Sequence, residues 1–170
     1  MIRDVADELS TLKYSHVERE RRFLVDPERR PALAGRPHIL IADRYLVGTR
    51  MRLRRMTAPD TGRVALKLTK KYESPDPRAR PMVTTYLNEA EYALLEGLPA
   101  QLLVKRRYPI GGFAIDIFEG ALAGLELAES EQGDAATLAA LAVPHWAVRE
   151  VTDDPAFEGG RLAAQGRMAA

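Results

Sequence analysis

The sequence contains no cysteine, which excludes disulfides, thiolate metal sites and a cysteine nucleophile. It has no apolar run of about 18 residues and no signal-peptide core at its start, so we expect a cytoplasmic protein without a membrane partner. The net charge is only +1, and we therefore expect no specific nucleic-acid partner. Carboxylate, imidazole and hydroxyl chemistry remain, which favours oxygen-ligated metals such as Mg²⁺ or Mn²⁺.

The composition is that of a soluble globular protein, since 46% of the 170 residues are hydrophobic. A chain of this length can bury its apolar surface in a single core. We therefore expect one domain over residues 1–170, with a short leading helix at 4–13.

Short alternating segments separated by turn signals predict a mostly antiparallel sheet or barrel. The first predicted strand runs from His16 to Val25. Seven further segments of this kind follow at 39–47, 50–56, 63–70, 82–87, 101–110, 112–120 and 125–131.

Helix signals occur between and after these strands. Asn88 and Glu91 have the spacing of a capping box ahead of a helix at 89–96. The other expectations are a helix at roughly 135–142 after Asp134, a helix from Asp154 interrupted at Gly159-Gly160, and an exposed loop at 73–81.

Charged residues recur at every second position of the strands, so they share one face of each. Glu18, Glu20 and Arg22 share a face of the first strand. Later strands place on one face the groups Arg50, Arg52 and Arg54; Lys67, Thr69 and Lys71; Lys105 and Arg107; Asp116; and Glu129 and Glu131. These faces could all point to solvent on an ordinary sheet. The separation of basic from acidic strands instead favours one cavity that binds phosphate through its cations and a divalent metal through its carboxylates.

The run VERERRFLV (17–25) resembles the glutamate-any-glutamate-any-lysine signature that opens the CYTH family, also called triphosphate tunnel metalloenzymes. Arg22 stands at the last place of that signature. The resemblance continues in family order through ADRYL (42–46), RMRLR (50–54), ALKLTKK (65–71), VKRRY (104–108), FAIDIFEG (113–120), GLELAESE (124–131) and REVTDDPAF (149–157). It implies an α+β, predominantly antiparallel β protein: an eight-stranded closed barrel with a few flanking helices and a triphosphate-binding tunnel.

The resemblance also implies roles for individual residues. The metal ligands for Mg²⁺ or Mn²⁺ would be Glu18, Glu20, Glu129 and Glu131. The phosphate-binding residues would be Arg22, Arg52, Arg54, Lys67, Lys105 and Arg107. Glu129 or Asp116 would orient the attacking water, while metal ligation or a salt bridge remains an alternative role for Asp116.

The implied function is metal-dependent hydrolysis of inorganic tripolyphosphate or of a nucleoside or other organic triphosphate. One alternative is an adenylyl cyclase of the CYTH type (class IV). Another is a non-catalytic polyphosphate or nucleotide-binding module, because Thr84 and Thr85 stand in a strand where the family carries acidic residues. The partner is thus a triphosphate small molecule, and a homodimer is left open.

Overall fold

The computed structural model describes residue 12 and residues 14–166, so the predicted leading helix lies outside the described residues except for its ninth position, Leu12. Within the described part, none of the helices has the length and apolar character needed to cross a membrane. The strands are β1 (His16–Val25), β2 (Ile39–Leu46), β3 (Met51–Ala58), β4 (Arg63–Lys71), β5 (Ala79–Leu87), β6 (Ala100–Ile110), β7 (Phe113–Phe118), β8 (Glu126–Glu131) and β9 (Ala147–Glu150).

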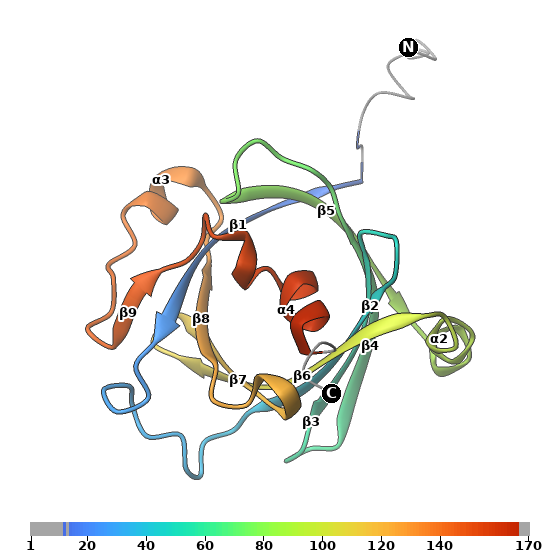
Figure 1. Cartoon of the computed structure of the whole chain (residues 1–170), viewed down its shortest axis with the longest axis horizontal. Helices are drawn as coiled ribbons and strands as arrows, with labels where there is room; N and C mark the ends of the chain where they lie inside the picture. Colours follow the sequence, from blue (N-terminus) through green and yellow to red (C-terminus); the bar gives the residue numbers. More distant parts are fainter. Residues whose placement is uncertain (1–11, 13, 167–170) are drawn as a thin grey trace.

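The strands form one antiparallel sheet in the order β5-β4-β3-β2-β6-β7-β8-β1-β9, and a further pairing of β1 with β5 closes it. One edge of β1 pairs with β8, and its other edge pairs first with β5 and then, from Phe23, with β9. This confirms the predicted eight-stranded closed barrel (Figure 1). Strand β9 is an addition that the sequence did not predict.

Helix α2 (Glu89–Glu96) lies outside the barrel (Figure 1), and its predicted capping box is confirmed. The Asn88 side chain accepts from the Glu91 amide, and the Glu91 side chain accepts from the Asn88 amide. The helix covers part of the outer face, where Tyr92 packs with Leu53 and Leu66.

Helix α3 (Ala135–Ala139) begins where predicted but is shorter, although Asp134 caps it by accepting from the Thr137 amide at 2.8 Å. The chain leaves the helix near Leu141, whose carbonyl accepts a hydrogen bond from Arg21 on β1. After β9, the short helix η2 (Pro155–Phe157) leads into α4 (Gly159–Gly166).

Two boundary predictions were wrong. Gly159 and Gly160 do not interrupt a helix but begin α4, because the helix starts against the Tyr45 ring, where a Cβ at position 159 would lie 1.9 Å from the hydroxyl oxygen. The predicted loop at 73–81 is also too long, since β5 begins at Ala79 and its first residues pair with β1. A second 3₁₀ helix, η1 (Gly120–Leu122), connects β7 to β8.

Apolar residues occupy the outer faces of the barrel and one of its ends. On the outside, Phe23, Phe113 and Trp146 belong to a buried cluster completed by Val25, Ile115 and Ala128. At one end, α4 lies across the centre of the ring of strands (Figure 1) and inserts Leu162 and Ala163 among Leu103, Phe118, Leu127 and Val151. The rest of the barrel interior is therefore left to polar side chains.

Candidate active site

The inner faces of the barrel strands surround a cavity of about 500 Å³, here called the lumen. Nine basic residues and four glutamates line it, so its wall carries an excess of positive charge. These residues are Arg22, Arg50, Arg52, Arg54, Lys71, Arg80, Lys105, Arg107 and Arg161, with Glu18, Glu20, Glu129 and Glu158. The alternation along the strands thus brings eight of the predicted site residues to one cavity.

Asp43, on β2, holds two of the phosphate-binding candidates. Its carboxylate is 1% exposed and accepts two hydrogen bonds from Arg54, at 2.6 and 2.7 Å, while the Nε of Arg52 lies 3.8 Å away. Burial opposes ionisation, but Arg54 and Arg52 outweigh it and lower the pKa of Asp43. The Nε of Arg52 is buried and makes no hydrogen bond within the described part of the chain, so this guanidinium is less fully bonded to the protein than that of Arg54.

Asp116, on β7, has the same role for the cations of β6. It is fully buried, bonds the Lys105 ammonium, and accepts two hydrogen bonds of 2.7 Å from Arg107. Arg107 also donates to Glu129 at 2.7 Å. The structure therefore gives Asp116 a salt-bridge role, which orients Lys105 and Arg107 along the lumen wall.

Arg22 connects the carboxylates of β1 and β8. It donates to Glu20 at 2.7 Å and to Glu129 at 3.1 Å. Burial opposes ionisation of Glu129, but Lys105, Arg107 and Arg22 outweigh it and hold its pKa well below the usual value. Glu20 behaves oppositely: burial and the neighbouring Glu129 charge raise its pKa despite Lys71 and Arg22.

Two predicted site residues lie elsewhere. The Lys67 ammonium is 5.0 Å from the centroid of the exposed Tyr86 ring. Glu131 lies at the end of β8, where its half-exposed carboxylate is 3.2 Å from His16. Lys71, the last residue of β4, lies in the lumen instead and bonds the carboxylate of Glu18.

The C-terminal segment also reaches the lumen. Arg22 donates to the carbonyl of Phe157 at 3.0 Å, and Arg80 of β5 bonds the carboxylate of Glu158. Burial opposes ionisation of Glu158, but Arg80 outweighs it and lowers its pKa. Two lumen cations therefore attach the start of α4 to the barrel.

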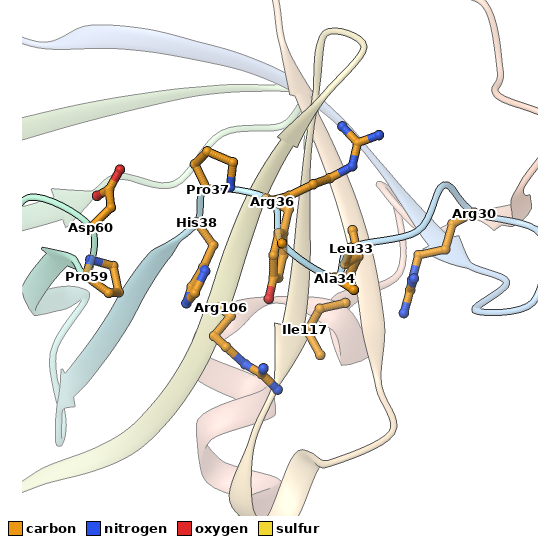
Figure 2. A pocket seen from close by; sticks show the side chains of 12 residues that line it. Arg30, Leu33, Ala34, Arg36, Pro37, His38, Pro59, Asp60, Arg106 and Ile117 are labelled. Atoms are coloured by element: carbon orange, nitrogen blue, oxygen red, sulfur yellow. The ribbon is translucent and has the colours of Figure 1, made fainter.

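A second cavity, about 710 Å³ in volume, lies outside the barrel beneath the loop at 26–38 (Figure 2). Leu33, Pro37 and Ile117 give it apolar walls, and its Arg30 is engaged by Glu126 at 2.5 and 2.9 Å. Arg106, on its floor, has a carboxylate partner in Glu119 at 2.8 Å. This cavity presents far fewer charged groups than the lumen, so the lumen is the better candidate site for a polyanion.

Comparisons with known proteins agree with the barrel. No family model matches the chain, and no curated protein does. Among solved structures, the crystal structure of the inorganic triphosphatase NE1496 is 22% identical, with a TM-score of 0.52 over 86% of this chain and 93% of that one. A second structure, described as hypothetical protein NE1496, is 24% identical, with a TM-score of 0.55 over 86% and 97% of the two chains. The chain therefore has the same barrel fold as these two structures.

The barrel geometry explains why some lumen residues were not predicted from the sequence. Asp43 stands between Ile41 and Tyr45 on the inner face of β2, and this alternation was a usable signal. Lys71 lies on the same face of β4 as Lys67, because every second residue of a strand shares a face. This alternation does not say how far along the barrel a residue lies. Arg80 and Glu158 lie in segments where no alternation was recognised.

The lumen carboxylates suit a hard divalent cation in their chemistry, because Mg²⁺ and Mn²⁺ prefer oxygen ligands. Two of them already share a positive charge: the Lys71 ammonium bonds Glu18 and lies 3.8 Å from Glu20. Within residues 12 and 14–166, no three His, Asp or Glu side chains are arranged together as a metal site. The type of donor atom thus suits a metal, but in this structure the carboxylates are paired with cations of the chain and are not gathered into a metal site.

Proposed function

We propose that the protein is a divalent-metal-dependent triphosphatase that hydrolyses a triphosphate within the lumen. The observation that carries this proposal is the excess of guanidinium and ammonium groups around a cavity of about 500 Å³. Ligand sites typically have volumes of about 300–1,000 Å³. A chain of linked phosphates offers the dense negative charge that such a wall would neutralise.

The phosphate contacts fall to Arg22, Arg52, Arg54, Lys105 and Arg107. Arginine donates two parallel hydrogen bonds to phosphate oxygens, and lysine acts as a compact charge. Asp43 and Asp116 orient most of these cations before a ligand arrives. Such preorganised donors stabilise charge that develops on phosphate oxygens in the transition state.

Glu18, Glu20 and Glu129 would hold the metal, which when bound supplies a Lewis acid at the phosphate oxygens. Burial and then the Glu129 charge raise the pKa of Glu20 despite Lys71 and Arg22, and a bound cation would oppose both causes. Glu131 remains a predicted ligand, although it lies against His16 at the end of β8.

Glu129 is the stronger of the two candidates for orienting the attacking water. It lines the lumen and is ionised, as its lowered pKa requires. Asp116 is fully occupied by Lys105 and Arg107. Its contribution is to position those two cations.

The test is release of orthophosphate from tripolyphosphate, ATP and thiamine triphosphate with Mg²⁺ or Mn²⁺. We expect turnover of at least one substrate, and we expect Glu18→Gln to lose both turnover and its dependence on metal. Glu28→Gln, an exposed residue outside the barrel, is the control. Unchanged kinetics of Glu18→Gln would contradict the proposed site.

A second candidate is a triphosphate-binding module without turnover. Glu18, Glu20 and Glu129 favour it because they are already paired with cations of the chain. Thr84 of β5 also favours it, because it stands where an acidic residue was expected and its hydroxyl bonds that of Thr69 at 2.9 Å. Tight tripolyphosphate binding without metal, together with no orthophosphate release, would support this candidate over the triphosphatase.

A further inference from the structure

Lys71 lies at the last position of β4 but contacts two carboxylates of β1. Its ammonium bonds Glu18 and lies 3.8 Å from an oxygen of Glu20. Strand β5 separates β4 from β1 in the barrel, so the side chain extends across the inner face to reach them. One monovalent cation is thus placed between the two carboxylates that the proposed function assigns to a metal.

The other cation beside these carboxylates is held differently. Arg22 donates to Glu20, Glu129 and the Phe157 carbonyl, so its planar guanidinium is fixed on three sides. Lys71 forms ion pairs with Glu18 and Glu20, and its side chain is 28% exposed. A flexible four-carbon stem lets an ammonium change partners at little cost. Lys71 is therefore the movable cation of this group.

Glu18, Glu20 and Glu129 all line the lumen, so the carboxylates beside Lys71 together carry more than one negative charge. A divalent ion would provide twice the charge of the ammonium at the same oxygens. The ammonium and the metal cannot both lie there, because like charges at contact distance repel strongly in a partly buried site.

We propose that Lys71 is an internal placeholder for the divalent cation. In the ligand-free protein its ammonium occupies the pair Glu18 and Glu20; a bound triphosphate draws the ammonium to phosphate oxygens and opens the pair to the metal. This inference rests on the proposed function for its ligand. It predicts that free protein binds metal weakly and that triphosphate and metal bind cooperatively.

The experiment measures Mn²⁺ binding to the free protein by electron paramagnetic resonance, without any phosphate compound. We expect Lys71→Met to bind Mn²⁺ about tenfold more tightly than the wild type, because the competing charge is gone. Lys70→Met is the matched control, since its ammonium lies over the Tyr72 ring, 5.1 Å from the centroid. Adding Glu18→Gln to Lys71→Met should abolish the gain, which locates the metal at this pair.

Lys71→Gln serves as a second variant that keeps a hydrogen-bond donor, and circular dichroism verifies the fold of each protein. Unchanged Mn²⁺ affinity in both Lys71 variants, or an equal gain in Lys70→Met, would overturn the placeholder. The two proposals fail separately. Tighter Mn²⁺ binding by Lys71→Met in a protein that hydrolyses no triphosphate contradicts only the triphosphatase, whereas turnover without that gain contradicts only the placeholder.

Discussion

The inner and outer faces of the barrel strands have opposite chemistry. Phe23 and Ile115 on the outside are fully buried in an apolar cluster, while their chain neighbours Arg22 and Asp116 point inward into ion pairs. One strand thus contributes to the hydrophobic core with one residue and to the candidate site with the next. Stability and ligand binding therefore depend mainly on different faces of the strands, and they should respond to different substitutions.

Phe113→Ala should have the largest effect on stability. Phe113 meets Phe23 and Trp146 in edge-to-face contacts, with centroids 6.1 and 5.4 Å apart. Removing a large core ring costs about 3–5 kcal/mol because a cavity remains. Urea denaturation measures this loss, and tripolyphosphate affinity per folded molecule should stay unchanged. A matching loss of affinity would break the separation between the two faces.

Arg52→Ala should weaken ligand binding and leave the stability of the fold nearly unchanged. Its guanidinium has an unbonded Nε in the lumen, and Asp43 keeps both hydrogen bonds from Arg54 when Arg52 is removed. We expect tripolyphosphate affinity to fall about 10- to 100-fold, as for loss of a charged hydrogen bond, with little change in unfolding. Isothermal titration calorimetry measures the affinity. Arg63→Ala, an exposed arginine at the start of β4, is the control and should bind as the wild type does.

An ion pair outside the lumen offers a smaller, pH-dependent effect. Hydrogen bonds from Arg21, at 3.0 and 2.7 Å, are the main cause that lowers the pKa of Glu150 below its ordinary 4.5. The ion pair therefore stabilises the fold fully above pH 4.5. Its contribution is lost as the pH falls through the lower pKa that Glu150 has in the folded protein. Glu150→Gln should lose about 1 kcal/mol at neutral pH and progressively less below 4.5. Denaturation curves measure the difference in unfolding free energy between the wild type and this variant. A difference that stays constant across this pH range would refute the assignment.

The smallest effect concerns the place where α4 meets the lumen. A methyl group at Gly159 would lie 1.9 Å from the Tyr45 hydroxyl, whereas one at Gly160 would make an ordinary 3.5 Å contact with the ring. We expect Gly159→Ala to destabilise the protein by about 1 kcal/mol, because Tyr45 and the start of α4 must shift. Gly160→Ala should be neutral or slightly stabilising, since alanine suits a helix better. Thermal unfolding measures the melting temperatures of the two variants. Equal temperatures would show that the close approach of Tyr45 to Gly159 has no energetic role.

Much of the barrel could be predicted because two-residue alternation directly reports which side chains share a face. It placed Glu18, Glu20, Arg52 and Lys105 on inner faces, where the structure has them. The alternation put Lys67 and Lys71 on one face, and the family resemblance gave the phosphate role to Lys67. Alternation gives no position along the barrel axis, and in the structure it is Lys71 that lines the lumen. Strand β9 was missed because four residues are too few to show a period.

The contribution of the C-terminal segment could not be predicted for a different reason. Glu158 and Phe157 reach the lumen only because α4 packs over the end of the barrel, which is a long-range contact with no local signature. The glycines before α4 looked like a helix interruption, and only the proximity of Tyr45 explains them. The sequence likewise left three roles open for Asp116, and the structure shows its carboxylate bonded by Arg107 and Lys105.

The pairing of the first strand has a consequence for synthesis on the ribosome. β1 finds its partners in β5 and in β8, so the cylinder stays open until residues near 131 have emerged. Non-local strand pairing of this kind is slow and leaves an unfinished sheet in contact with other chains. In this protein the surface exposed during that interval includes the future inner wall, rich in arginine and glutamate, which water solvates well. These charges would help to keep the half-made barrel solvated until Trp146 covers its apolar outer face.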